Sequence, residues 1–241
     1  MTEPERDDGA PWRNFYGRRR GKKLRRGQAE LVETRLAELT PPGITWGENP
    51  DREPIDLAAL FPGKSEVWLE IGFGGGEHMI AQAGRYPGIG LIGCEPYING
   101  VAKLLAAIEG AGLRNLAITD ADARDVMDVL PEASIGRVFL NYPDPWPKTR
   151  HHKRRFIKSE NIEQLAHVMA PGAELRIATD IGDYVRHTLE HLANDRRFEW
   201  SAESPRDWRG PWLDWPSTRY EAKALREGRQ PHYLTFRRSL A

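Results

Sequence analysis

Three carboxylates stand where apolar, strand-like segments of the chain end. Glu70, Glu95 and Asp122 each lie at or just beyond such a segment. The segments are VWLEI (67–71), IGLIGCE (89–95) and LAITD (116–120). In an open parallel sheet, ligands bind in the crevice at the carboxyl ends of the strands. We therefore expect the three carboxylates to face one ligand, although the spacing leaves Asp120 as an alternative to Asp122.

A glycine-rich turn joins the first of these strands to a helix that we expect to begin at about Glu77. Its sequence, EIGFGGGE (70–77), places Gly72, Gly74 and Gly76 where the backbone can approach a ligand closely. The turn is not a dinucleotide fingerprint, because Glu77 stands where G-x-G-x-x-G requires glycine. A negative side chain at that helix N-terminus would also compete with a pyrophosphate for the same N–H groups. The pattern favours a cofactor without phosphate.

S-adenosylmethionine is a phosphate-free cofactor whose functional groups match the three carboxylates. Glu70 is placed to accept from its ammonium group, Glu95 from two ribose hydroxyls, and Asp122 from the adenine amino group. Each acid has an alternative role, since carboxylates also cap helix N-termini. A nicotinamide-dependent oxidoreductase would share the sheet and the glycine turn. The set of acids favours S-adenosylmethionine as methyl donor, with S-adenosylhomocysteine as product.

A fourth carboxylate, Asp144, is held between prolines at the end of the next expected strand. The segment reads NYPDPWPK (141–148), with proline at positions 143, 145 and 147. Each proline fixes its own φ and restricts the residue before it, so Asp144 and Trp146 have little conformational freedom. Rigid placement suits a catalytic group that orients a second substrate against a cofactor. The alternative is a proline-rich turn in which the aspartate is a local cap.

A block of positive charge follows Asp144 directly. It comprises Lys148, Arg150, Lys153, Arg154, Arg155 and Lys158, with no acid before Glu160. A block of one sign is typical of a surface that binds a phosphate backbone. His151 and His152 lie inside the block, but no acid or cysteine at metal-ligand spacing accompanies them. We therefore expect contact with RNA and no bound metal.

The first 28 residues carry a second basic run and almost no apolar periodicity. Seven Lys or Arg residues lie between positions 18 and 26. We interpret residues 1–28 as a flexible basic arm for polyanions, in which Phe15 and Tyr16 can stack on bases. The alternative is a disordered, solvated tail. Residues 29–64 are expected to form an N-terminal helix, over 29–40, and a linker.

From residue 65 to residue 241, strands and helices alternate at the spacing of an α/β domain. Further strands are expected at 136–142, 173–180, 198–203 and 232–238, and helices at 98–110, 160–170 and 183–195. This alternation predicts a mostly parallel, doubly wound sheet. With the three strands above it would have about seven strands, including an antiparallel edge strand.

Composition sets limits on the class of protein. The chain has 241 residues, and its 35 Lys and Arg balance its 35 Asp and Glu, which excludes a wholly basic binding domain but not local patches. A single cysteine, Cys94, excludes an intrachain disulfide and a cysteine zinc cluster. No apolar segment has the length of a signal peptide or of a membrane span. We expect a cytoplasmic protein without membrane contact.

The motifs together resemble the bacterial tRNA (guanine-N7-)-methyltransferases. The resemblance rests on EIGFGGGE (70–77), PDPWPKTRHHKRR (143–155) and TRYE (218–221), and spans roughly residues 65 to 238. Tyr142 and Thr149 depart from the family pattern, which usually has phenylalanine and lysine there. The resemblance implies a Rossmann-like, class I S-adenosylmethionine-dependent methyltransferase fold. It also implies that a guanine in the tRNA variable loop is methylated.

The resemblance also implies roles for individual residues. Positions that contact the methyl donor are matched by Glu70, Glu95, Asp122 and Asp144, of which Asp144 also matches the catalytic residue. Positions that contact the substrate are matched by Lys148, Asp180, Thr218, Arg219, Tyr220 and Glu221, and Arg150 to Arg155 match an RNA-interacting segment. The implied partner is tRNA. We expect no obligate protein partner, and a monomer or weak homodimer.

The chemistry of guanine N7 shapes what these residues need to do. N7 carries an available lone pair, so it needs no deprotonation before it attacks a sulfonium methyl. We therefore expect carboxylates that hold the donors of the guanine and favour its developing positive charge, with Asp144, Asp180 and Glu221 as candidates. Trp208, Trp212 and Trp215 either line this site or pack in the core. A non-catalytic RNA-binding protein with the same fold is the remaining alternative.

Overall fold

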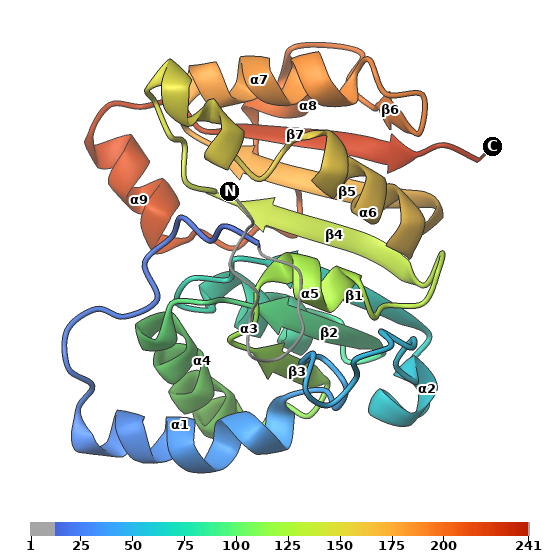
Figure 1. Cartoon of the computed structure of the whole chain (residues 1–241). Coiled ribbons are helices and arrows are strands. Elements are labelled where there is room, and N and C mark those ends of the chain that lie inside the picture. Colours follow the sequence, from blue (N-terminus) through green and yellow to red (C-terminus); the bar gives the residue numbers. More distant parts are fainter. Residues whose placement is uncertain (1–12, 241) are drawn as a thin grey trace, which may run out of the picture.

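A computed structural model describes residues 13 to 240 as a seven-stranded sheet with helices on both faces (Figure 1). The strand order is β3-β2-β1-β4-β5-β7-β6. The first five strands in this order run parallel, whereas β7 is antiparallel to β5 and β6 is antiparallel to β7. The prediction of a mostly parallel α/β sheet with an antiparallel edge is confirmed.

The elements alternate along the chain as the sequence predicts. The strands are β1 (Glu66–Ile71), β2 (Ile89–Cys94), β3 (Leu116–Thr119), β4 (Ile135–Asn141), β5 (Met169–Thr179), β6 (Phe198–Trp200) and β7 (His232–Arg238). The helices are α1 (Arg26–Leu39), α2 (Leu57–Leu60), α3 (Glu77–Arg85), α4 (Ile98–Ala111), α5 (Ala123–Met127), the 3-10 helix η1 (Thr149–Arg154), α6 (Ser159–Val168), α7 (Gly182–Leu192), α8 (Arg206–Arg209) and α9 (Arg219–Arg226). No helix within residues 13 to 240 is both long and apolar enough to cross a membrane.

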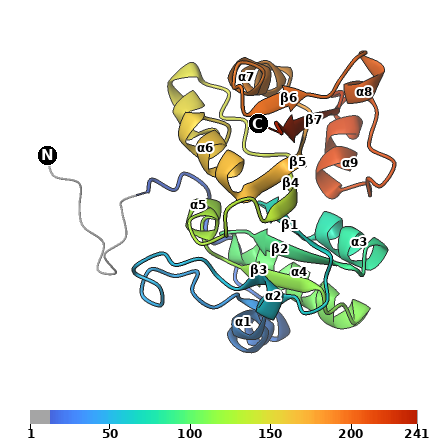
Figure 2. The ribbon, with the colours of Figure 1, turned by 90° about the vertical axis from the view of Figure 1, so that its right-hand side faces the viewer.

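The sheet separates two hydrophobic cores, because successive side chains of a strand point to opposite faces. On β1, Val67, Leu69 and Ile71 pack with α5, α6 and α7, whereas Trp68 packs on the other face with α3 and α4. Figure 2 shows these layers along the sheet, with α5 and α6 on one side and α3 and α9 on the other. Helix α1 covers α4 from outside. The layering leaves the carboxyl edge of the sheet free to form a site.

Several boundaries differ from the prediction. The first helix begins at Arg26 and not at residue 29, so it includes the last residues of the expected arm, and the strand expected over 198–203 ends at Trp200. The helix expected to run to residue 170 ends at Val168, and the next two residues already belong to β5. Met169 pairs with Ile135 of β4, so strand pairing extends the strand toward the helix. Pro171 and Gly172 therefore lie within a strand near its start, where a missing N–H or an unusual φ is tolerated.

The strand tips are held by hydrogen bonds that continue past the regular pairing. The Gly72 N–H donates to the Cys94 carbonyl at 2.8 Å, and the Glu95 N–H donates to the Thr119 carbonyl at 3.1 Å. Beyond β4, the Tyr142 N–H donates to a β5 carbonyl at 2.7 Å, although Tyr142 itself has a φ of 51°. These bonds fix the direction in which each tip leaves the sheet.

Candidate active site

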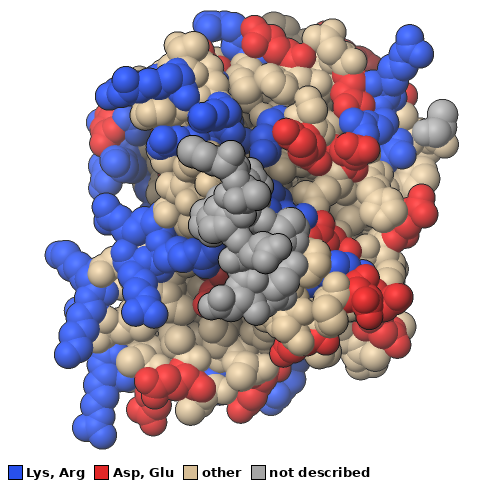
Figure 3. Space-filling view, viewed as in Figure 1, with Lys and Arg blue, Asp and Glu red and all other residues tan. Residues whose placement is uncertain are grey.

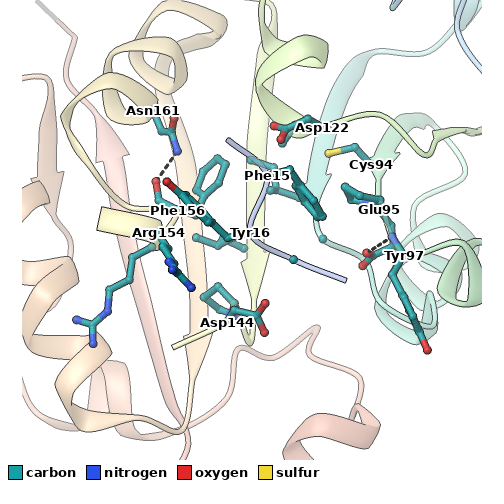
Figure 4. Close-up of a pocket in the computed structure, with 18 of the residues that line it drawn as sticks. Phe15, Tyr16, Cys94, Glu95, Tyr97, Asp122, Asp144, Arg154, Phe156 and Asn161 are labelled. Atoms are coloured by element: carbon teal, nitrogen blue, oxygen red, sulfur yellow. Dashed lines mark hydrogen bonds between the residues drawn. The ribbon is translucent and has the colours of Figure 1, made fainter. Parts of the chain in front are cut away.

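A cavity of about 450 Å³ lies at the carboxyl ends of β1, β2 and β4 (Figure 4). Predicted site residues in its wall are Gly72, Gly74, Glu95, Asp122, Asp144, Lys153, Arg154, Arg155 and Tyr220. The other predicted residues, Glu70, Gly76, Lys148, Arg150, Asp180, Thr218, Arg219 and Glu221, lie outside this wall. The fold thus brings to one cavity three of the four acids that were matched to donor-contacting positions, namely Glu95, Asp122 and Asp144.

Glu95, at the tip of β2, is held by the glycine turn. Its Oε2 accepts from the Gly74 N–H at 2.7 Å, and its Oε1 accepts from the Tyr97 N–H at 2.9 Å. Gly100 makes this approach possible, since a Cβ there would lie 2.1 Å from the Gly74 carbonyl oxygen. Burial raises the pKa of the Glu95 carboxyl. Each carboxylate oxygen keeps a free lone-pair site for a ligand hydroxyl.

Asp122, beyond β3, combines the predicted ligand position with the alternative capping role. It is the N-cap of α5, where its Oδ1 accepts from the Arg124 N–H at 2.9 Å. The Arg124 guanidinium also donates to both carboxylate oxygens, at 2.9 and 2.7 Å. Burial favours the neutral acid, but the hydrogen bonds and charge of Arg124 outweigh it and lower the pKa of Asp122. Asp120 is exposed and lies outside the cavity wall, so of the two aspartates only Asp122 lines the cavity.

Glu70 has a different place from the one that its position at a strand end suggests. Its side chain points to the α3 face of the sheet and is buried, with Oε2 2.6 Å from the His78 Nδ1. The His78 ring packs between Phe139 and Trp215, with ring centroids 4.6 and 5.2 Å away. This pair braces the first turn of α3 from below, and the carboxylate does not reach the cavity wall.

Gly76 serves helix packing. It is the N-cap of α3 with a φ of 82°, and a Cβ there would lie 2.5 Å from Leu104 Cδ1 of α4. The need for glycine at this position therefore comes from the approach of α4 and from the left-handed backbone. Gly74 differs, because it lines the cavity and donates its N–H to Glu95.

Asp144 stands on the loop between β4 and η1, at the mouth of the cavity. Its residue is exposed, and no side-chain hydrogen bond or ion pair to it occurs within residues 13 to 240. The cavity wall nonetheless removes part of its hydration, which raises the pKa of Asp144. Its charge also contributes to the raised pKa of Glu95, as expected for two carboxylates that face one cavity.

The loop that carries Asp144 is fastened from beneath by Arg155. This side chain is 1% exposed, and its Nε donates to the Pro145 carbonyl at 2.9 Å while its Nη2 pairs with Asp183. The adjoining Trp146 has a φ of 42°, a conformation that needs such support. Arg155 was expected to contact RNA, but the structure gives it no exposed guanidinium and places it as a support of the loop.

The cations expected to contact RNA otherwise lie on the surface. Lys148, Arg150 and Lys153 are exposed on and beside η1. Figure 3 shows Lys and Arg side chains gathered along the left side of the face that is turned to the viewer, while acidic and basic side chains are mixed on its right side. A locally basic surface therefore exists although the chain has no net charge.

The TRYE segment begins α9, and only its tyrosine lines the cavity. Thr218 is the N-cap and accepts from the Glu221 N–H at 3.3 Å, while Arg219 lies 3.6 Å from the carboxylate of Glu77. Glu221 is buried and accepts from Trp215 Nε1 at 3.0 Å and from the Tyr233 hydroxyl. The hydrogen bond from Trp215 and the contacts of Trp208 and Trp212 with neighbouring rings indicate packing roles for these tryptophans.

Asp180 likewise has a partner of its own. It pairs with Arg229, which also contacts Glu227. As a result, two of the three carboxylates expected to hold guanine, Asp180 and Glu221, are already bonded to side chains of this protein. Asp144 remains without such a partner in the described part of the chain.

Asn141, the last residue of β4, is a site residue that the sequence patterns did not single out. It lines the cavity, and both its Oδ1 and its Nδ2 are buried without a hydrogen-bond partner among the described residues. Buried carboxamides are normally bonded, so two orphaned atoms in a cavity wall point to a missing ligand. The available signal was its position, a polar residue at the end of a strand.

Residues 14 to 18 of the basic arm also line the cavity. The sequence predicts a flexible arm for RNA over residues 1–28, of which residues 1 to 12 lie outside the described residues. Among residues 13 to 240, no group of three or more His, Cys, Asp or Glu side chains is arranged to hold a metal ion.

Comparisons with known proteins extend over most of the chain. A family model described as "Putative methyltransferase" matches residues 64–234. The tRNA (guanine-N(7)-)-methyltransferase of Roseobacter denitrificans is 60% identical over 226 residues, which cover 94% of this chain and 96% of the relative. The protein of the same name from Ruegeria sp. (strain TM1040) is 58% identical over 230 residues, 95% of this chain and 89% of the relative. The crystal structure of the 16S rRNA methyltransferase KamB matches with a TM-score of 0.52 at 17% identity, over 73% of this chain and 89% of that chain, which is a likeness of fold.

Proposed function

The chain belongs to the tRNA (guanine-N7-)-methyltransferases, and on that premise we propose that its target is a guanine in the variable loop of tRNA. It transfers a methyl group from S-adenosylmethionine to N7 of a guanine in tRNA and forms 7-methylguanosine. The observation that carries the assignment of the site is the Asp144 carboxylate, which has no side-chain partner within residues 13 to 240 and stands at the mouth of the cavity that Glu95 and Asp122 line.

The residues of the cavity fit the methyl donor. The cavity volume of about 450 Å³ lies in the range of small-molecule sites. Asp122 and Glu95, on neighbouring strands, offer acceptors to the adenine and ribose end, and the Gly72–Gly74 turn gives close backbone approach. When bound, the donor supplies an electrophilic sulfonium methyl group.

Asn141 completes the fit at the amino-acid end of the donor. One carboxamide offers an acceptor and two donor hydrogens, which suits an ammonium and a carboxylate group on one ligand. Because Glu70 is occupied by His78, Asn141 replaces it here as the proposed acceptor for the ammonium group. The burial of both amide atoms favours this inner ligand over a base that enters from the surface.

The reaction depends on a guanine that is held in position and on a favourable electrostatic field. It does not need a protein group that accepts a proton from N7. N7 attacks with its own lone pair, and the guanine becomes positively charged as the bond from N7 to the methyl carbon forms and the bond from that carbon to sulfur breaks, which leaves S-adenosylhomocysteine with the electron pair. A fixed carboxylate in a partly desolvated site favours that charge, because its field is less screened than in water. Asp144 is placed for this role, and its backbone needs little rearrangement since prolines 143 and 145 and Arg155 hold the loop.

The exposed cations place the RNA over the cavity mouth. Lys153 lines the cavity, Lys148 and Arg150 are exposed at the start of the same 3-10 helix, η1, and all three are suited to phosphate oxygens. A base in folded tRNA reaches a recessed site by leaving its stack, as enzymes that modify bases require. Tyr220, which lines the cavity and is 43% exposed, offers a ring on which such a base can stack.

The test is incubation of the purified protein with labelled donor and unmodified tRNA, followed by nucleoside analysis. We expect 7-methylguanosine in wild-type reactions and its absence when the variable-loop guanine is replaced by adenine. Methylation that persists in the adenine-substituted tRNA would refute the variable-loop assignment. Absence of 7-methylguanosine from every tRNA tested would refute the activity.

A further inference from the structure

Residues 13 to 25, here called the strap, cross the cavity from α5 to α4. At the α5 end, Arg13 pairs with Asp125 at 2.8 Å and with Asp128 at 2.6 Å. The guanidinium of Arg124 donates to the Asn14 carbonyl at 3.2 Å. Arg124 is the same side chain that holds Asp122, so this end of the strap is joined to the predicted adenine site.

The other end of the strap is fastened to the start of α4. The Ile98 N–H donates to the Arg19 carbonyl at 3.0 Å. Asn99 bonds twice, since its Oδ1 accepts from the Gly21 N–H at 2.8 Å and its Nδ2 donates to the Lys22 carbonyl at 2.7 Å. Helix α4 follows Glu95 directly, so the two anchors stand on the two sides of the predicted adenosine site.

Between the anchors, two aromatic side chains of the strap face inward. Figure 4 shows Phe15 beside Asp122, Cys94 and Glu95. Tyr16 reaches the loop of Asp144, where the Arg154 guanidinium lies 4.8 Å from the Tyr16 ring and 4.9 Å from the Trp146 ring. The strap therefore touches both the donor side and the catalytic side of the cavity.

The strap forms a wall of the cavity and does not fill it. With Phe15 and Tyr16 in place, about 450 Å³ remains, which is enough for a cofactor. Exposed cations of the strap that lie outside the cavity wall include Arg20 and Lys23. One short segment thus has an aromatic face toward the cofactor and a basic face toward a polyanion.

We propose that Phe15 is a donor-binding residue, packed against the adenosine end of S-adenosylmethionine, and that tRNA bound to the outer cations of the strap holds it closed over the donor. The inference rests on the proposed function and adds to it a coupling between two ligands. If RNA favours the closed strap and the closed strap binds the donor more tightly, each ligand must strengthen the binding of the other by the same factor. Exchange of S-adenosylhomocysteine for fresh donor then requires the strap to open, which RNA release favours.

The first experiment measures binding of S-adenosylhomocysteine to the full-length protein by calorimetry, without RNA. Phe15→Ala should weaken binding about tenfold, as expected when one buried aromatic contact is lost. Glu33→Ala, an exposed position of α1, which follows the strap, should bind like wild type, and thermal melting of the free proteins should show that both variants fold. Unchanged binding in Phe15→Ala would refute the role of Phe15 as a donor-binding residue. Tighter binding of S-adenosylhomocysteine would show that Phe15 obstructs the site, and would also refute its role in donor binding.

The second experiment measures the rate at which S-adenosylhomocysteine dissociates, with and without saturating unmodified tRNA. In the wild-type protein, tRNA should slow dissociation about tenfold, a typical coupling between two sites. The double variant Arg20→Ala/Lys23→Ala should lose most of this slowing while its dissociation rate without RNA stays the same. Equal rates with and without tRNA in wild type would refute the coupling. Formation of 7-methylguanosine by wild-type protein tests the proposed function separately. The proposal about the strap can therefore be refuted while the proposed function is upheld.

Discussion

Asn115 and Asn141 place the same carboxamide at opposite ends of the sheet, with opposite results. Asn115 precedes β3 at the amino edge, and its Nδ2 donates to the carbonyls of Ala83, Tyr86 and Ile89 at 3.1, 3.3 and 2.9 Å. Asn141 ends β4 at the carboxyl edge, and both its amide atoms are buried without a partner in the described chain. The Asn115 side chain forms its hydrogen bonds within the fold, whereas the Asn141 side chain is free to bond to a ligand. At the amino edge of the sheet this side chain therefore contributes to stability, whereas at the carboxyl edge it is available for ligand binding.

The same contrast exists within the carboxyl edge. Glu95 and Asp122 are held by backbone N–H groups or by Arg124, so the adenosine side of the cavity is formed before any ligand binds. Asp144 and Asn141, on the β4 side, have no side-chain partner in the residues that the structure describes. We infer that donor recognition on β2 and β3 is preorganised, and that the β4 side gains its hydrogen bonds only from the two substrates.

Removal of the Asp144 carboxylate should give the largest effect on activity. Asp144→Ala and Asp144→Asn should each lower the single-turnover rate of methyl transfer by about 10²- to 10³-fold, the usual size for loss of one electrostatic contact to a transition state. Because the carboxylate has no partner within residues 13 to 240, thermal stability should not fall. Product binding should also stay close to wild type, which calorimetry would show.

The Asn variant separates charge from shape. If Asp144→Asn kept most of the rate, the negative charge of the carboxylate would not be what favours transfer. Asp144 would then not distinguish the β4 side of the cavity from the β2–β3 side by its chemistry. A matched control is Asp207→Asn, an exposed aspartate that bonds to backbone N–H groups of the 203–204 turn, away from the cavity. That variant should retain the wild-type rate.

The two asparagines provide the most direct test of the comparison. Asn141→Ala should weaken S-adenosylhomocysteine binding about 10- to 100-fold, since hydrogen bonds to charged groups contribute about 1.5–3 kcal/mol. Its free energy of unfolding without ligand should change by less than about 0.5 kcal/mol or rise, because Asn141 makes no side-chain hydrogen bond within residues 13 to 240 that could be lost. Calorimetry and denaturant unfolding measure the two quantities.

Asn115→Ala is the control, and it should show the reverse pattern. It leaves one buried and two partly buried carbonyls without this donor, which should lower the free energy of unfolding by about 2–3 kcal/mol. Product binding should remain within about twofold of wild type once the protein is folded. Similar behaviour of the two variants, in either assay, would contradict the distinction between the edges.

Much of this arrangement was predictable from the sequence, because the local rules agree with the fold. Apolar runs followed by acids identified β1, β2 and β3 and placed Glu95 and Asp122 at one edge. The proline-flanked Asp144 was correctly expected at the end of β4, beside the cavity. These features depend on strand direction and spacing, which single segments encode.

The remaining features depend on contacts between distant segments. Glu70 points inward because it shares a face of β1 with Trp68, and its partner His78 is recognisable only once α3 has folded over that face. Arg155 looks like its basic neighbours in the sequence, but only its side chain reaches beneath the loop to Pro145. The course of the strap rests on pairs such as Arg13 with Asp125, 112 residues apart, which no local pattern predicts.

The pH dependence of transfer should reflect the raised pKa values of Asp144 and Glu95. A raised pKa means that each carboxyl stays protonated to a higher pH, and a protonated Asp144 cannot favour the cationic guanine. The single-turnover rate should therefore fall as pH is lowered through that raised pKa, and begin to fall at a higher pH than for an ordinary aspartate. In Asp144→Asn the residual rate should lose this acid limb, whereas a limb of unchanged shape would assign it to another group.

The smallest effects are expected at the RNA surface, where many weak contacts add up. Lys153→Ala should reduce the magnitude of the slope of log affinity for tRNA against log salt by about 1, and weaken binding at physiological salt only a few fold. Arg155→Ala is the informative partner, because this buried residue supports the loop and pairs with Asp183. It should lower the melting temperature and the transfer rate while leaving the salt slope near the wild-type value. A smaller slope in Arg155→Ala, with normal stability, would move Arg155 back among the RNA contacts and would show that the loop of Asp144 does not depend on it.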